Sequence, residues 1–163
     1  IPLRDLTPVV NAVPGATAIA EVLDRNEWVQ QSGNPVSYAA AIRKELPVGF
    51  AAKPVIFQFA KGDQTVPNPT TSAILRAGGL SDRATYFRND LAYAQNPAVG
   101  KNPHVFLTNI GNAAAAGYAV GAQQQIAAFF ASRGALTIDP DGVGPFFEAP
   151  IVGPLPEVLN FIP

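Results

Sequence analysis

Two stretches of the chain carry the apolar and β-branched residues typical of β-strands. Residues 53–60, KPVIFQFA, form a mostly continuous apolar run, as in strands buried on both faces of a parallel sheet. Residues 83–89, RATYFRN, are rich in β-branched and aromatic residues. Between them, Asn68 as N-cap, Pro69 at the first helical position and glycines at 78–79 predict a helix. Strand, helix and strand in this order predict two parallel strands joined by a right-handed crossover.

Three further helices are predicted on either side of this unit. Turn signals frame two of them, over residues 16–31 and 36–46. A third begins with Asn112 as its cap and ends near Arg133, with Gly134 at its C-terminal cap position. The spacing of its apolar residues predicts one stripe along this helix, formed by Tyr118, Ala122, Ile126, Phe129, Phe130 and the stem of Arg133.

Prolines divide the end of the chain into short pieces. Residues 135–163 contain six of them, which excludes a long helix. Regularly placed apolar residues argue against free disorder, so we expect an extended strap lying on the domain or on a neighbour. The sequence thus predicts an α/β fold in one incomplete domain: a helical lead-in over 1–50, a strand-helix-strand-loop-helix core over 53–133, and the tail over 135–163.

Composition narrows the classes of function. Of the 163 residues, 48% are hydrophobic and 14% are charged, and the net charge is -1. That charge gives no reason to expect nucleic acid as a partner. No cysteine and a single histidine exclude thiolate and multi-histidine metal sites. The apolar excess suggests a surface covered by another chain or by residues outside this one.

The chain begins with Ile1 and contains no methionine. We therefore expect that a segment precedes it. The first residues, IPLRDLTP, lack the basic region and apolar core of a signal peptide.

An acid and the histidine follow the two predicted strands. Asp63 leaves the first strand, and His104 lies in the loop after the second. Parallel strands end at the same edge of a sheet, where α/β proteins bind ligands. A histidine acting as a base needs an acceptor for its other ring nitrogen. We expect Asp63 and His104 to meet at this edge.

These motifs resemble the α/β-hydrolase family. VIFQFAKGDQTVPNPTTSAIL is similar to that family's strand, acid turn and helix, with Val66-Pro67 three and four residues after Asp63. NPHVFL resembles its histidine loop, and the long helix after it resembles the family's final helix. The resemblance covers about residues 50 to 133. In its residue sequence and in its C-terminal tail, the chain is also similar to the C-terminal part of bacterial secreted lipase/esterase-like proteins.

The resemblance implies a Ser-His-Asp triad with Asp63 as acid and His104 as base. The family's G-x-S-x-G motif is absent, and its order places the serine before the acid. The chain therefore looks like the C-terminal part of a serine hydrolase of carboxylic esters, lipid-like ones among them, and should be inactive alone. The resemblance implies no metal or organic cofactor, a secreted or periplasmic location, and association with the missing N-terminal part or a second copy.

Other interpretations remain open for the same residues. Asp63 can simply cap a turn, and His104 can be a structural imidazole. Asp90, at the end of the second strand, is an alternative acid, whereas Ser32 lies at the wrong place in the family's order.

Further residues have less specific interpretations. Tyr93, Asn96 and Phe106 can border an acyl pocket or pack the loop. Trp28 is expected in a core or an interface, and Arg83 and Arg88 at solvated strand ends.

The rival function is a non-catalytic α/β binding module. An incomplete sheet would expose an edge strand, through which such a module could associate.

Overall fold

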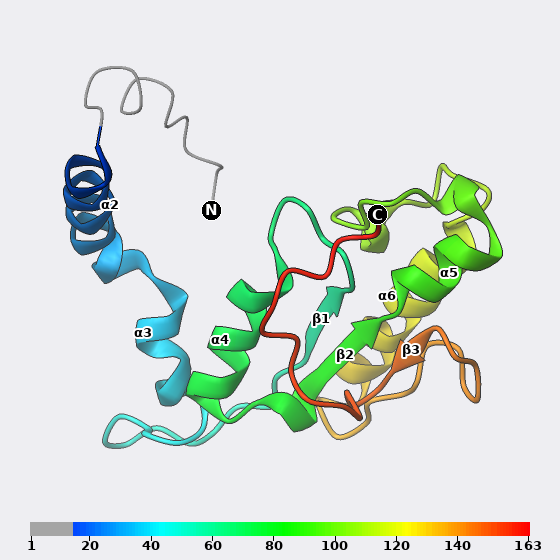
Figure 1. Cartoon of the computed structure of the whole chain (residues 1–163). Coiled ribbons are helices and arrows are strands. Elements are labelled where there is room, and N and C mark those ends of the chain that lie inside the picture. The colour runs from blue at the N-terminus through cyan, green and yellow to red at the C-terminus, as the bar shows by residue number, and fades with distance from the viewer. Residues whose placement is uncertain (1–14) are drawn as a thin grey trace.

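The computed structural model describes residues 15–163 and shows a mixed α/β fold around a small sheet (Figure 1). The strands are β1 (Phe57–Ala60), β2 (Ala84–Phe87) and β3 (Phe147–Glu148), in the order β1-β2-β3. β1 and β2 are parallel, and β3 is antiparallel to β2. The predicted parallel pair is confirmed, while β3 comes from the part of the chain expected to be only a strap.

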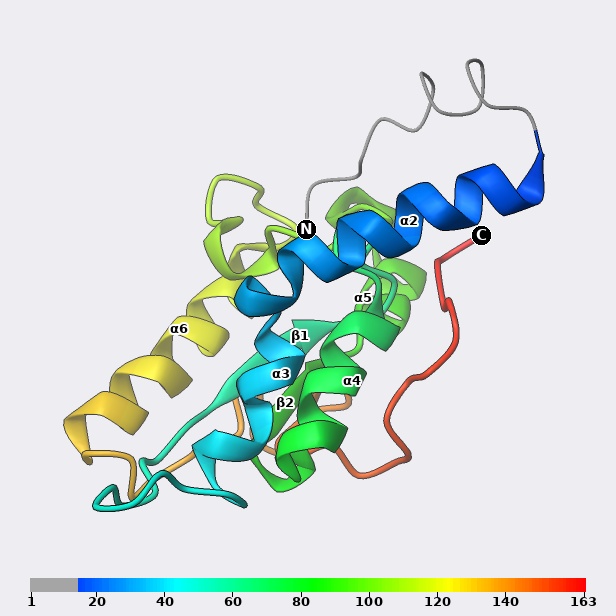
Figure 2. The same cartoon turned by 90° about the vertical axis from the view of Figure 1, so that its left-hand side faces the viewer.

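Helices cover both faces of the sheet. The α-helices are α2 (Ala16–Gln30), α3 (Pro35–Ala39), α4 (Asn68–Gly78), α5 (Asn89–Gln95) and α6 (Ala116–Ala131). Short 3₁₀ turns are η1 (Gln31–Gly33), η2 (Ala40–Ile42), η3 (Ser81–Arg83), η4 (Pro97–Val99) and η5 (Phe106–Thr108). In Figures 1 and 2, α3 and α4 lie on one side of the sheet and α6 on the other.

Alternating residues of the strands supply the two halves of the core. Phe59 and Tyr86 pack with Leu75 of α4 on one face. Ala60 and Phe87 pack on the other face, where Ala122 of α6 belongs to the same cluster. Successive strand side chains point to opposite faces, so both sides of β1 and β2 are covered. This explains why the strands read as apolar runs rather than as alternating patterns.

The predicted helix over residues 36–46 is wrong in length. The α-helix ends at Ala39, and a 3₁₀ turn follows up to Ile42. The next two side chains turn towards the end of α4, where Arg43 donates to Gly79 O and Lys44 Nζ donates to Arg76 O at 3.2 Å. These carbonyls lie at the C-terminal end of α4, where cationic side chains stabilise a helix. The tertiary contact therefore replaces the last turn of the expected helix.

The predicted boundaries of α4 are close to the observed ones. It begins at Asn68 with Pro67 as N-cap, so the Asn68 side chain is not the cap and is used elsewhere. Gly79 ends the helix with φ 63°, a left-handed conformation that favours glycine.

The long C-terminal helix starts later than predicted. α6 begins at Ala116, and the Asn112 side chain accepts from Ala114 N at 3.0 Å in the turn before it. The predicted stripe is partly correct: Ala122 and Phe129 are buried, but Phe130 is 71% exposed. α5, directly after β2, was expected to be a loop.

The C-terminal segment, residues 149–163, contains neither helix nor strand. Ile151 N donates to Ala84 O at 2.8 Å beside β2. Further along, Ser72 Oγ of α4 donates to Pro156 O at 2.8 Å. Figure 1 shows this segment in red, passing along the α4 side towards the loops that follow the strands.

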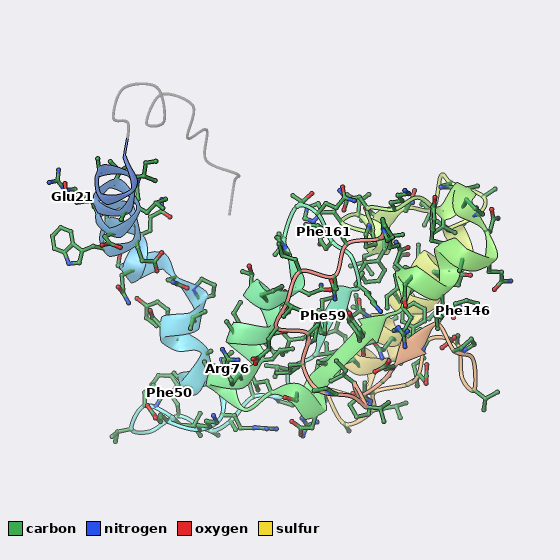
Figure 3. The ribbon with its side chains drawn as sticks, viewed as in Figure 1. Glu21, Phe50, Phe59, Arg76, Phe146 and Phe161 are labelled. Carbon is green, nitrogen blue, oxygen red and sulfur yellow. The ribbon has the colours of Figure 1, made fainter. Side chains whose placement is uncertain are left out.

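The α2 helix projects away from the sheet and its covering helices (Figure 1). Figure 3 shows Glu21 on this helix and Phe59 in the middle of the packed body. Trp28 on α2 is 78% exposed, so it does not lie in the core, and its place in an interface stays a prediction. Within residues 15–163, no helix is both long enough and apolar enough to span a membrane.

Candidate functional site

The structure brings Asp63 and His104 into contact, 41 residues apart in the chain. His104 Nδ1 lies 3.1 Å from Asp63 Oδ2. A carboxylate can only accept, so this hydrogen bond places the ring proton on Nδ1. Nε2 then carries the lone pair, and it has no hydrogen-bond partner among the described residues. The His104 side chain is 39% exposed and that of Asp63 is 14% exposed. The arrangement is that of an oriented base whose second ring nitrogen is not engaged by the described residues.

Asp63 lies in the turn after β1, residues 61–67, which we call the acid turn. Its Oδ1 accepts from the backbone N–H groups of Thr65 and Val66, both at 2.8 Å. The other oxygen, Oδ2, is left for His104. Asp63 therefore caps its turn with one carboxylate oxygen and contacts His104 with the other, so the two interpretations of Asp63 are compatible.

A hydrogen-bond network holds the acid turn against the sheet. Gly62 has φ 87°, a conformation that L side chains rarely adopt, and its N–H lies 3.3 Å from Asn68 Oδ1 and 3.2 Å from Asn160 Oδ1. Asn68 Nδ2 also donates to Ala60 O at 2.7 Å. Asn160 Nδ2 donates to Tyr86 Oη at 3.1 Å. The end of β1, the start of α4 and the C-terminal segment thus fix the same turn.

Tyr86 contributes a buried hydroxyl to this network. Burial raises the pKa of Tyr86, and the hydrogen bond from Asn160 opposes that effect. The hydroxyl is therefore a neutral donor and acceptor, and it lies 3.4 Å from Asn68 Oδ1. The network is structural support for the acid turn.

His104 lies in residues 100–105, which we call the histidine loop. At its start, Asn89 Nδ2 donates to Gly100 O at 3.1 Å, and Asn89 is fully buried. Asn102 Oδ1 accepts from His104 N at 3.2 Å and from Gln64 N of the acid turn at 3.1 Å. The loop is thus attached both to the start of α5 and to the acid turn.

Asp90 is not the partner of His104, which corrects the alternative assignment. Its Oδ2 accepts from Lys61 Nζ at 2.9 Å and from Arg88 Nη2 at 2.8 Å. Burial raises the pKa of Asp90, but the hydrogen bonds from Arg88 and Lys61 outweigh it and hold the pKa at about 2. Arg88 also pairs with Glu148 of β3, so it links two strands rather than solvating a strand end.

No serine of residues 15–163 is hydrogen-bonded to His104. Ser32 lies in η1, where its carbonyl accepts from Tyr38 Oη at 2.6 Å. The hydroxyls of Ser72 and Ser132 donate to the backbone carbonyls of Pro156 and Phe129. None of these contacts gives a serine that His104 could activate.

The three candidate pocket residues hold the loops together. Phe106 stacks on Phe87 of β2, with ring centroids 5.2 Å apart. Asn96 Oδ1 accepts from Ala98 N at 3.1 Å and caps η4. The Tyr93 ring lies 5.8 Å from Lys101 Nζ. Packing the loop is the interpretation that these contacts support.

A cavity of about 290 Å³ lies between the C-terminal segment and the ends of the strands. Lys61 and Arg88 line it, and both are already paired with Asp90. Neither Asp63 nor His104 is among its lining residues. This cavity is separate from the acid–base pair.

Asn102 and Asn160 are the site residues that sequence reasoning missed. Asn102 stands two residues before His104, a spacing at which asparagine often accepts from the backbone. The sequence therefore indicates the local contact with His104 N, but it does not indicate the bond to Gln64. Asn160 is 98 residues from Gly62, and no local pattern predicts this contact.

Comparison with known proteins gave no matching family model, no matching curated protein and no matching solved structure.

Proposed function

We propose that Asp63 and His104 are the acid and base of a Ser-His-Asp triad in a hydrolase of carboxylic esters. The serine would come from a segment preceding Ile1. The observation that carries this proposal is the 3.1 Å contact between His104 Nδ1 and Asp63 Oδ2, which leaves Nε2 without a hydrogen-bond partner among the described residues. A turn-capping aspartate alone would not need a histidine at its second oxygen.

The proposed reaction uses the ring as a proton carrier. The serine oxygen forms a bond to the ester carbonyl carbon while its proton passes to Nε2 of His104. As the bond to the leaving alcohol breaks, Nε2 returns the proton to that alcohol. Water then repeats both steps and releases the acid and the serine. Asp63 stabilises the imidazolium through Nδ1–H. This reaction needs no metal or organic cofactor.

Further parts of the proposal rest on the sequence resemblance. We propose that the mixed α/β unit is the C-terminal part of an α/β-hydrolase and that residues 135–163, apart from β3, act as its strap. The substrate would be an ester or a lipid-like molecule, and the protein would be secreted or periplasmic.

The site assignment is tested in the longer protein with a short-chain aryl ester. His104→Ala and Asp63→Asn should each lower kcat by about 10³-fold or more, as expected for members of one triad. Asp82→Asn is the matched control, since Asp82 lies in η3 before β2 and pairs with the exposed Arg43. It should leave kcat unchanged. Unchanged turnover in both site variants would show that the assignment is wrong.

The origin of the nucleophile has its own test. The sequence preceding Ile1 should contain G-x-S-x-G between a predicted strand and a predicted helix. A serine-directed phosphonate should label the longer protein but not the 163-residue chain. Labelling of the shorter chain would reveal a nucleophile that the structure does not identify.

The second candidate function is a non-catalytic module that associates through the sheet edge. It is favoured by the strand order, which leaves β1 at one edge of the described sheet. Such a module would dimerise or bind an added strand there. Sedimentation of the 163-residue chain measures this directly, and a monomer at micromolar concentration together with ester turnover by the longer protein would exclude it.

A further inference from the structure

The Asn102 side chain joins the two loops that carry Asp63 and His104. Its Oδ1 accepts from His104 N at 3.2 Å within its own loop and from Gln64 N at 3.1 Å in the acid turn. Its Nδ2 lies 3.4 Å from Thr65 Oγ1, also in the acid turn. One amide therefore bonds to the residue that follows Asp63 and to the backbone of His104 itself.

We propose that Asn102 is a positioning residue that fixes the separation between Asp63 and His104. This inference rests on the proposed function, because a positioning residue serves a reaction. An amide oxygen has two lone pairs, and here two backbone N–H groups from different loops use them. Moving one loop against the other breaks one of these bonds.

The geometry shows why such a device is needed. The Asp63–His104 bond is already 3.1 Å long, so a shift of about 1 Å would end it. His104 is 39% exposed, which lets water compete for Nδ1–H. At the start of the histidine loop, Asn89 holds only Gly100 and Lys101. Apart from the His104–Asp63 contact itself, the side-chain hydrogen bonds that link the histidine loop to the acid turn among the described residues all come from Asn102.

The tautomer of His104 provides a readout that general stability does not move. Which ring nitrogen carries the proton depends on the hydrogen bonds that the two ring nitrogens make. Because the chain has one histidine, ¹⁵N-histidine labelling gives one pair of ring-nitrogen signals. In the 163-residue chain at a pH where the ring is neutral, these signals should show the proton on Nδ1. Asp63→Asn, which replaces the acceptor carboxylate, serves as the reference for a lost contact.

Asn102→Ala should shift both ring-nitrogen signals towards those of Asp63→Asn. Asn102→Ser should do the same, because its hydroxyl can still accept from His104 N but is too short to reach Gln64. Asn109→Ala is the matched control in the next turn, since the Asn109 side chain makes no hydrogen bond to any residue that the structure describes. It should keep the wild-type signals.

Wild-type ring signals in Asn102→Ala would overturn the proposal, even if its melting temperature fell. Wild-type signals in Asn102→Ser would also overturn it, because the bond to Gln64 would then be dispensable. In the longer protein, Asn102→Ala should lower kcat about 10- to 100-fold with KM within about twofold, as for a misplaced catalytic group. If no ester is hydrolysed by that protein, the proposed function fails, whereas the tautomer result still decides whether Asn102 positions the pair.

Discussion

Individual residues around the site make two different contacts with one side chain. Asp63 caps its own turn with Oδ1 and meets His104 with Oδ2. Asn68 accepts from Gly62 N and donates to Ala60 O. Such double use follows from short polar side chains with two functional atoms each. It also means that residue type and spacing indicate a site without revealing all the contacts.

Asp90 gives a prediction at the residue scale. Its folded pKa of about 2 lies below the ordinary 3.8, because Arg88 and Lys61 stabilise the ionised form more than burial opposes it. A lowered pKa adds stability above pH 4 and loses it as the pH falls towards 2. Asp90→Asn should therefore lower the free energy of unfolding by about 2 kcal/mol at pH 7, and the difference should vanish near pH 2.

Urea unfolding at pH 7, 4, 3 and 2 measures this effect. Asp82→Asn is the control, since its pair with Arg43 has side chains 55% and 37% exposed. Exposed pairs contribute at most about 1 kcal/mol. A pH-independent difference for Asp90→Asn would contradict the linkage between this ion pair and stability.

At the scale of elements, the C-terminal segment decides how the acid turn is supported. It contacts β2 through Ile151, α4 through Pro156 and the acid turn through Asn160. The spaced prolines of this segment lack the backbone N–H groups of a regular sheet ladder, so the segment is held by separate single contacts. Its last residues lie close to the turn: a Cβ at Gly62 would meet Ile162 at 3.4 Å.

Asn160→Ala tests this support. The change removes the donor to Tyr86 Oη and one acceptor of Gly62 N–H. It should lower the free energy of unfolding by about 1 to 2 kcal/mol, the usual effect of leaving partly buried polar groups without partners. Val158→Ala in the same segment should change it by less than about 0.5 kcal/mol, because Val158 is 73% exposed. Equal effects of the two variants in urea unfolding would argue against a specific role for Asn160.

At the scale of the whole molecule, the sheet and its covering helices are one packed body and α2 stands apart. The body has two apolar clusters, one on each face of the sheet. On α2, Leu23, Trp28 and Val29 are 42%, 78% and 69% exposed. An isolated helix of 15 residues is marginal in water.

Deletion of residues 15–33 from a chain that begins at Gly15 should therefore leave the thermal midpoint of the body within a few degrees, as expected for a change of less than about 1 kcal/mol. Deletion of residues 149–163 should lower it clearly, because the contacts to β2, α4 and the acid turn are lost. Circular dichroism follows both, and it does not depend on Trp28, which the first deletion removes. A large fall after the first deletion would show that α2 stabilises the body.

The sequence by itself determined the central unit of this protein. Apolar runs, an asparagine-proline helix start and a glycine helix end are local signals, and they placed β1, α4 and β2 in the right order. The same signals put Asp63 and His104 at one edge of a parallel pair. Their short-range character explains the success, since each depends on neighbouring residues and on one topological rule.

Only the tertiary structure decided the contacts between segments far apart in the chain. β3 pairs with β2, and Arg88 N donates to Phe146 O just beyond the paired residues. Arg43 and Lys44 bond to the end of α4 instead of extending the second lead-in helix. Asp90 pairs with Lys61 and Arg88 rather than with His104 for the same kind of reason. The bond between Asn102 and Gln64 spans 38 residues. Such contacts depend on how loops and side chains pack in space, which no local periodicity encodes.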